Sequence, residues 1–313
     1  MILKQVIEIF ELLDKPSANG GEVAKYIENY GNDNLKVNVE TVKGKQGSTD
    51  FIKILIKGKN GKSNNGSAKT LGIIGRLGGL GARPEMNGFV SDGDGALTAL
   101  SAALKLVDMN TKGDILEGDV IVATHICPDA RTLKHYLGYF MDSPVDMDTM
   151  NRLEVSDEMD AILAIDTTKG NEILNYRGFS ISPTVKDGYI LKVSNDIINI
   201  MKRVTGKPPV VFPLSQQDVT PYGNELYHLN SILQPSTTTS SPVVGVAITT
   251  ETSVAGCATG STQVTDVETA GKFAIEIAKE YGQGKCSFYD EKEFELLIKL
   301  YGENRRFQRK GNI

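Results

Sequence analysis

The chain has 313 residues, 40% of them hydrophobic, with a formal net charge of −5 and a pI near 5.4. This composition is typical of a globular protein with enough length to bury a large core. The acidic balance disfavours phosphate backbones and anionic membranes, so we expect no nucleic acid and no membrane among its partners. No stretch approaches 18 apolar residues, and the first 15 residues lack the pattern of a signal peptide.

The three cysteines, Cys127, Cys257 and Cys286, are widely spaced and form no CxxC pair. An odd number at such spacing argues against a disulfide framework, and the missing CxxC excludes a structural zinc knuckle. Together with the missing leader pattern, this usage predicts a reducing, cytoplasmic location.

The first half of the chain alternates between helical and strand patterns. Apolar residues at helical spacing predict a helix over 2–14, and a second short helix is expected over 21–30. The run of turn-forming residues over 58–69 predicts a surface loop. The remaining patterns predict strands over 35–43, 51–57, 71–75 and 119–126, and a helix that begins near 92–95 and continues to 109.

The second half continues this alternation. We expect strands over 159–166, 189–193, 208–213 and 242–249, and helices over 195–204, 266–281 and 290–301. Residues 303–313 carry a basic cluster and are expected to form a flexible tail. Alternating strands and helices predict a single α/β domain over 1–313, with three α/β/α layers around a mainly parallel central sheet.

Ligands of open parallel sheets bind beyond the carboxyl ends of the strands. Several polar or reactive residues follow the predicted strands directly, and we expect them to converge on one edge: Arg76, His125, Cys127, Asp129, Asp166, Asp218 and Cys257.

A metal site is the first interpretation of this set, because His125, Asp129, Asp166 and Asp92 are ligand types for a divalent cation. Structural alternatives stay open for each of them. Asp92, or Asp94 beside it, can cap the helix that begins there. Asp166 can pair with Arg76 or Lys169, and His125 can be a core histidine.

Two other chemistries have weaker support in the sequence. Cys127 lies two residues from His125, but neighbours on an extended segment rarely meet as nucleophile and base, so a small buried thiol is favoured. The segment GRLGGLG after residue 74 matches neither standard phosphate-binding motif, and its glycines are better explained by tight turns.

Five segments carry a resemblance to known proteins: GIIGRLGGLGARPE, SDGDGALTALSAALKL, GDVIVATHICPDA, AILAIDTTKGN and VVGVAITTETSVAGCATGS. They resemble an uncharacterised bacterial family described as a domain of unknown function. The order of elements is also similar to that of the zinc-dependent exopeptidases, the superfamily of aminopeptidases and carboxypeptidases. That similarity implies a zinc-exopeptidase-like fold, two zinc ions that activate a water, a glutamate as general base, and frequent oligomers.

The superfamily's ligand positions are only partly matched. Asp92 is similar to its bridging aspartate and Asp166 to its fourth ligand, and Cys257 falls near its late histidine. Asp218, in QQDVTPYGN, resembles the acid of a Gly-Thr-Asp segment. Arg76 replaces the first histidine ligand, and a permanent cation there opposes a second dication.

The sequence therefore predicts a hydrolase-like protein acting on a small peptide, amide or amino-acid derivative, with one divalent metal, zinc or manganese, as an optional cofactor. The metal ligands would be Asp92, Asp166, His125 and Cys257. His125 and Asp129 would be catalytic, and Arg76 and Asp218 would bind substrate. The alternative is a non-catalytic protein that binds a small carboxylate or zwitterion on an exopeptidase-like scaffold. A homo-oligomer is compatible with both.

Overall fold

The computed structural model describes residues 1–44, 47–76, 88–127, 129–130, 132–135, 138–252 and 260–311. Its elements in chain order are α1 (Leu3–Leu13), α2 (Gly20–Glu28), β1 (Leu35–Gly44), β2 (Gly47–Ile56), η1 (Lys62–Asn64), β3 (Leu71–Gly75), η2 (Ser91–Gly93), α3 (Asp94–Thr111), β4 (Val120–Ile126), β5 (Thr132–His135), β6 (Gly138–Met141), α4 (Met147–Glu154), β7 (Ala161–Thr168), β8 (Gly178–Ile181), β9 (Val185–Lys186), β10 (Tyr189–Ile190), α5 (Asn195–Thr205), η3 (Gln217–Val219), η4 (Ser231–Thr237), β11 (Val243–Thr249), α6 (Val264–Gly282), α7 (Glu291–Tyr301) and η6 (Arg305–Gln308).

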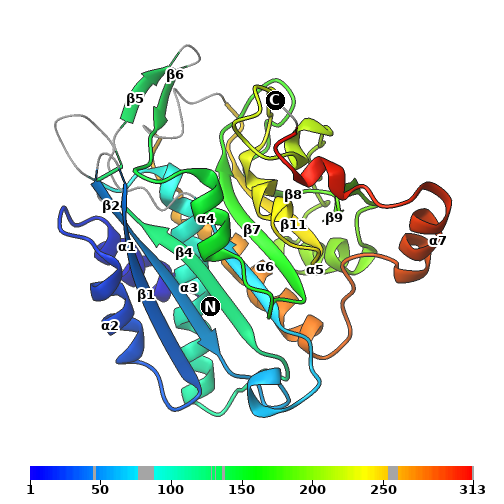
Figure 1. The fold of residues 1–313 in the computed structure, drawn as a ribbon. Helices are drawn as coiled ribbons and strands as arrows, with labels where there is room; N and C mark the ends of the chain where they lie inside the picture. Colours follow the sequence, from blue (N-terminus) through cyan, green and yellow to red (C-terminus); the bar gives the residue numbers. More distant parts are fainter. Residues whose placement is uncertain are drawn as a thin grey trace.

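One sheet runs through the molecule in the order β1-β2-β4-β3-β7-β11-β9-β10, with β8 also paired to β11. The four central strands, β4, β3, β7 and β11, are parallel, and antiparallel strands extend the sheet on both sides. The β5–β6 hairpin follows β4 and stands above the sheet in Figure 1. The carboxyl ends of the parallel strands therefore lie at the top of that view.

Helices cover both faces of the sheet, which confirms the predicted three-layer α/β fold with a mainly parallel centre (Figure 1). Side chains of one parity, such as Ile73 and Leu163, join a core cluster with α1, α3, α5 and α6. Side chains of the other parity, such as Ile74 and Ala164, pack in a second cluster with Ile232 of η4. The four central strands are buried on both faces, as parallel strands between two helical layers are.

Two predicted strands differ in the structure. Residues 208–213 form only one isolated bridge, between Val211 and Ile181 of β8. Three prolines in PPVVFP remove backbone donors, which is why no ladder extends there. The strand predicted over 189–193 is reduced to β10, which pairs with β9. The β5–β6 hairpin and the helix α4 were not predicted.

The two segments expected to be a surface loop and a tail are held by side chains. Within 58–69, the amides of Gly58 and Ser63 donate to the carboxylate of Asp119, each at 2.8 Å. At the C-terminal end, Gln308 of η6 donates to the carbonyl of Thr239 at 3.2 Å. Among the described helices, none is long and apolar enough to cross a membrane.

Candidate functional site

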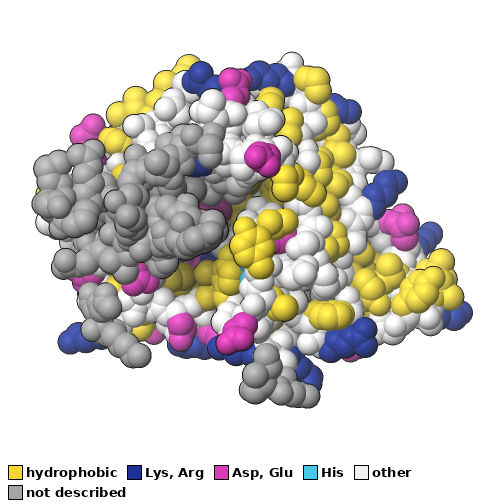
Figure 2. Space-filling view, turned by 90° about the horizontal axis from the view of Figure 1, so that it is seen from above, with side chains coloured by type: hydrophobic (Ala, Val, Ile, Leu, Met, Phe, Trp, Pro, Cys, Tyr) yellow, Lys and Arg dark blue, Asp and Glu magenta, His cyan; other side chains and the backbone are white. Residues whose placement is uncertain are grey.

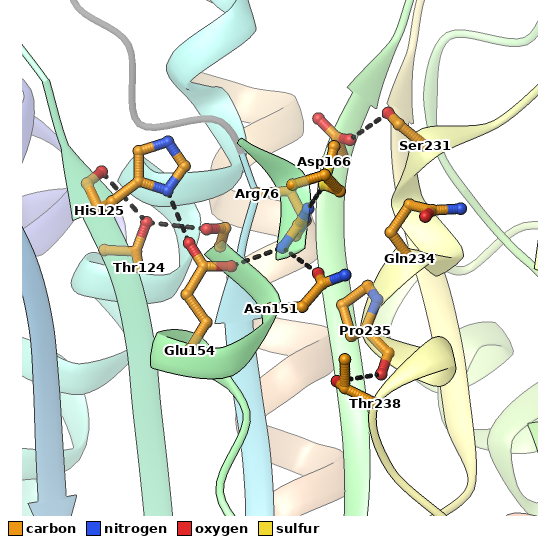
Figure 3. Close-up of polar contacts among 12 residues, drawn as sticks. Arg76, Thr124, His125, Asn151, Glu154, Asp166, Ser231, Gln234, Pro235 and Thr238 are labelled. Atoms are coloured by element: carbon orange, nitrogen blue, oxygen red, sulfur yellow. Dashed lines mark hydrogen bonds and ion pairs between the residues drawn. The ribbon is translucent and has the colours of Figure 1, made fainter. Parts of the chain in front are cut away.

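Three predicted site residues come from three adjacent strands. His125 lies on β4, Arg76 directly follows β3, and Asp166 lies on β7. The backbone N–H of Arg76 donates to Ile165 O at 2.7 Å, which continues the β3–β7 pairing to the end of the sheet. Figure 3 shows the three side chains on the face that α4 and η4 cover. The structure thus places them at one edge, as parallel strands dictate.

Helix α4 brings a carboxylate between two of these residues. Glu154 Oε2 accepts from Arg76 Nη1 at 2.6 Å, and its Oε1 lies 2.6 Å from His125 Nδ1. Asn151, one turn earlier, accepts from the same arginine nitrogen at 3.1 Å. We call Arg76, Glu154 and His125 the α4 charge cluster (Figure 3). Glu154 is 0% exposed and Arg76 is 1% exposed, so this ion pair is fully inside the protein.

The electrostatics of the cluster favour an ionised Glu154. Burial raises the pKa of this carboxyl, but the charges of Arg76 and His125 outweigh burial and hold the pKa below its usual range. The guanidinium of Arg76 is therefore neutralised by α4. Its Nε is buried and has no hydrogen-bond partner in the described part of the chain. The predicted role of Arg76, a clamp for a substrate carboxylate, has to compete with this internal partner.

A second pair of acids lies beside the cluster. Asp166 accepts from its neighbour's amide, Thr167 N, at 2.7 Å and from Ser231 Oγ at 3.3 Å (Figure 3). The hydroxyl of Thr167 donates to the carbonyl of Ser91 at 2.6 Å, which ties β7 to η2. The two carboxyls are near enough for the charge of Asp166 to contribute to the raised pKa of Asp92. We call Asp92 and Asp166 the carboxyl pair.

Both acids of the carboxyl pair are buried, and both have raised pKa values. Burial raises the pKa of Asp166 to about 6, against the lowering effects of the Thr167 amide and Arg76. Burial, and then the charge of Asp166, raises the pKa of Asp92 to about 7. Because the charge of Asp166 helps to raise the pKa of Asp92, ionisation of one carboxyl opposes ionisation of the other.

Asp94 and Lys169 complete the surroundings of the carboxyl pair. Asp94 Oδ1 accepts from Thr262 Oγ1 at 2.7 Å, and burial raises its pKa to about 7. Lys169, 8% exposed, lowers the pKa values of both Asp92 and Asp94 through its charge. The residues at the N-caps of η2 and α3, Val90 and Gly93, make no side-chain capping bond.

The carboxylates of Asp129 and Asp218 both accept hydrogen bonds from donors outside the α4 charge cluster and the carboxyl pair. Asp129 Oδ2 accepts from the Ser48 amide at 2.8 Å, at the start of β2, whereas the carboxylate that holds His125 belongs to Glu154. Asp218 is fully buried and accepts four hydrogen bonds of 2.6–2.8 Å, two from Ser215 and one each from the amides of Leu229 and Asn230. These four donors use the capacity of its carboxylate.

The predicted metal site is only partly within the described residues. Cys257, one of the four predicted ligands, lies outside them. Within the described ranges, no group of three or more His, Cys, Asp or Glu side chains could hold a metal ion. The carboxyl pair provides two ligands and has the ammonium of Lys169 nearby, a donor set that does not by itself fit zinc or manganese. We therefore derive no chemical step through a metal.

Comparison with known families identifies the family to which the sequence belongs. Residues 40–311 match the family described as "Protein of unknown function (DUF1177)". The chain belongs to this family. No curated protein matches the DUF1177 chain. Among solved structures, it is similar to a mutant of tomato leucine aminopeptidase, with a TM-score of 0.52 and 13% identity over 88% of this chain and 61% of that one. The DUF1177 chain thus spans less than two thirds of the aminopeptidase's length, and the likeness shows the fold alone.

The sequence patterns did not indicate three residues of this site, Glu154, Asn151 and Ser231. A signal for α4 exists, because Asp146 is a good N-cap residue and does accept from Thr149 N at 2.8 Å. The helix has only eight residues, however, and its pattern is short enough to be taken for a loop. Ser231 lies in an irregular segment, and only the fold places it beside Asp166.

Proposed function

We propose that this DUF1177 protein is a hydrolase-like enzyme that cleaves a small amide, peptide or amino-acid derivative at the carboxyl pair. The observation that carries the proposal is the burial of two acids, Asp92 and Asp166, near the carboxyl ends of the parallel strands, where the charge of Asp166 acts on Asp92. Carboxyls with pKa values of about 6 and about 7 suit general acid–base chemistry near neutral pH. The aminopeptidase-like fold is a secondary support.

In the proposed reaction one carboxyl of the pair is ionised and the other is protonated. Asp166, with the lower pKa, takes a proton from water while the water oxygen bonds to the amide carbon. Asp92 then gives its proton to the leaving nitrogen as the carbon–nitrogen bond breaks. The pair ends with its protonation reversed, and one proton transfer restores it. Asp166 is assigned as the base because the Thr167 amide, the Ser231 hydroxyl and the charge of Arg76 favour its ionised form.

The other predicted site residues have supporting roles in this proposal. Glu154 fixes the ring of His125 through Nδ1, which makes His125 a proposed second proton-transfer group. Arg76 and Asp218 already have internal partners, so the proposal uses neither as a substrate clamp. A zinc or manganese ion would need ligands beyond Asp92 and Asp166 and is a separate proposal, as are a small-molecule partner, a homo-oligomer and a cytoplasmic location. Elemental mass spectrometry of untagged protein purified without chelator tests the metal.

The test is a hydrolysis screen of amino-acid amides and dipeptides with the wild type and Asp166→Asn. Asparagine keeps the size of the side chain and cannot act as a base, so we expect a loss of roughly 10²–10⁴-fold in kcat/KM with the fold retained. Glu158→Gln, at an exposed position four residues after Glu154, is the matched control and should retain full activity.

Three results would separate the alternatives. Unchanged hydrolysis in Asp166→Asn would refute the role of the carboxyl pair. Binding of amides without any turnover, weakened by Asp166→Asn, would favour the non-catalytic binding protein. An Asp166→Asn variant that fails to fold would give Asp166 a structural role, and Asp92→Asn would then test the pair from its other member.

A further inference from the structure

A cavity of about 370 Å³ opens at the carboxyl end of β7, close to the carboxyl pair. Its volume lies in the range of small-molecule sites. We call it the β7 cavity. Its walls are largely apolar and come from the segments after β7 and before η4, and they include Ile173, Leu174, Phe212, Tyr227, Leu229 and Asn230.

Three large apolar side chains at the rim of the β7 cavity are exposed to solvent. Tyr227 is 69% exposed, Ile173 is 62% exposed and Leu229 is 50% exposed. Figure 2 looks down on this edge of the sheet and shows apolar side chains gathered on that face. Scattered apolar side chains on a surface need no explanation, but three around one cavity form a patch that an apolar ligand group would cover.

On both walls of the cavity, side-chain oxygens accept hydrogen bonds from backbone amides and hold the backbone in place. On one wall, Asn171 Oδ1 accepts from the amides of Ile173 and Leu174, both at 2.8 Å. On the other, Asp218 Oδ1 accepts from the amides of Leu229 at 2.6 Å and Asn230 at 2.7 Å. These bonds fix the backbone that carries the apolar side chains, as in a binding pocket formed before its ligand arrives.

Two residues that line the β7 cavity are close to Asp166 along the chain or through a neighbour. Asn230 lines the cavity, and its neighbour Ser231 donates to Asp166 Oδ2 at 3.3 Å. Thr168, another lining residue, is two positions after Asp166 on β7. A ligand whose apolar group enters the cavity can therefore extend its polar end toward Asp166.

We infer that the β7 cavity is the specificity subsite of this protein and takes one large apolar side chain of the substrate, of leucine to tryptophan size. The preferred substrates are then amides or related derivatives of large apolar amino acids. The inference rests on the proposed function for the reacting end of the substrate, whereas the binding of the apolar end is independent of turnover.

The sequence contains no tryptophan, so the fluorescence of tryptophanamide, excited beyond tyrosine absorption, reports its binding directly. We expect a blue-shifted emission and raised anisotropy when protein is added. Leu229→Ser and Ile173→Ser, on opposite walls, should each weaken binding by roughly tenfold to a hundredfold. Both substitutions leave the pinning backbone amides in place. Leu300→Ser, at a 61% exposed position on α7, is the control and should bind as the wild type does.

Equal binding by all four proteins, or no binding by any, would overturn the subsite. In the hydrolysis screen, leucinamide should be preferred to glycinamide, and Leu229→Ser should remove that preference. Hydrolysis with no preference for the larger side chain would overturn the subsite and leave the proposed function standing. Cavity-dependent binding of tryptophanamide without hydrolysis would support the subsite and count against the proposed function.

Discussion

Replacing Asp92 by asparagine is expected to stabilise the protein at neutral and alkaline pH. The fold keeps this carboxyl buried, beside the charge of Asp166, and raises its pKa from 3.8 to about 7. The folded state therefore prefers the protonated form, and the free energy of unfolding falls as pH rises from about 4 to about 7. A pKa difference of this size corresponds to about 4 kcal/mol above the upper pKa. Asparagine stays neutral at every pH and avoids that cost.

This free-energy difference predicts a measurable shift of the midpoint temperature of unfolding, Tm. With an unfolding entropy of about 2.1 cal/mol/K per residue, a chain of this length moves its midpoint by about 1.5 °C per kcal/mol. Asp92→Asn should therefore raise Tm by about 6 °C near pH 8 and leave it unchanged near pH 4. Calorimetry at a series of pH values measures this, with Asp157→Asn, at an exposed position, as the control.

The pH dependence of the increase in Tm tests whether the buried Asp92 carboxyl destabilises the folded protein. A Tm at pH 8 equal to or below that of the wild type would refute the buried, destabilised carboxyl. A gain of the same size at both pH values would mean that the substitution acts through packing. The same variant should lose hydrolysis under the proposed function, so a more stable protein without activity would show a site maintained at the expense of stability.

Two further predictions concern the buried acids that have partners. Glu154→Ala should cost about 3–5 kcal/mol in urea unfolding, because it leaves Arg76 buried and unpaired, whereas Glu158→Ala should cost almost nothing; a loss below about 1 kcal/mol would contradict the ion pair. Asp218→Ala leaves the amides of Leu229 and Asn230 without their acceptor; we expect a loss of about 1–3 kcal/mol and weaker tryptophanamide binding, and unaltered binding would show that Asp218 does not shape the β7 cavity.

The sequence predicted the central sheet well because buried parallel strands have a strong pattern. The apolar runs that became β3, β4, β7 and β11 were each recognised, and the rule that ligands bind at their carboxyl ends brought His125, Arg76 and Asp166 to one edge. The edges of the sheet were less predictable. At 208–213 the β-branched residues favour a strand, but the prolines limit pairing to one bridge.

The partners of the site residues could not be predicted, because they come from segments without a strong pattern. His125 and the nearby Asp129 were expected to act together as catalytic residues, yet the carboxylate beside His125 belongs to Glu154, 29 positions further along the chain. Asp218 was expected to face substrate, and instead its oxygens organise a loop. In both cases the sequence indicated the residue, but only the three-dimensional path of the chain determines its hydrogen-bond partner.

The internal pairing of Arg76 with Glu154 links the end of β3 to α4, 78 positions away in sequence. Neither residue can change alone without leaving a charge enclosed in the protein, whereas an apolar pair of similar volume can replace both at little cost where His125 is replaced as well. Members of the DUF1177 family should therefore vary at these two positions together, as arginine with an acid or as two apolar residues. A relative with an acid at position 154 and an apolar residue at position 76 would need a new cation in the same place.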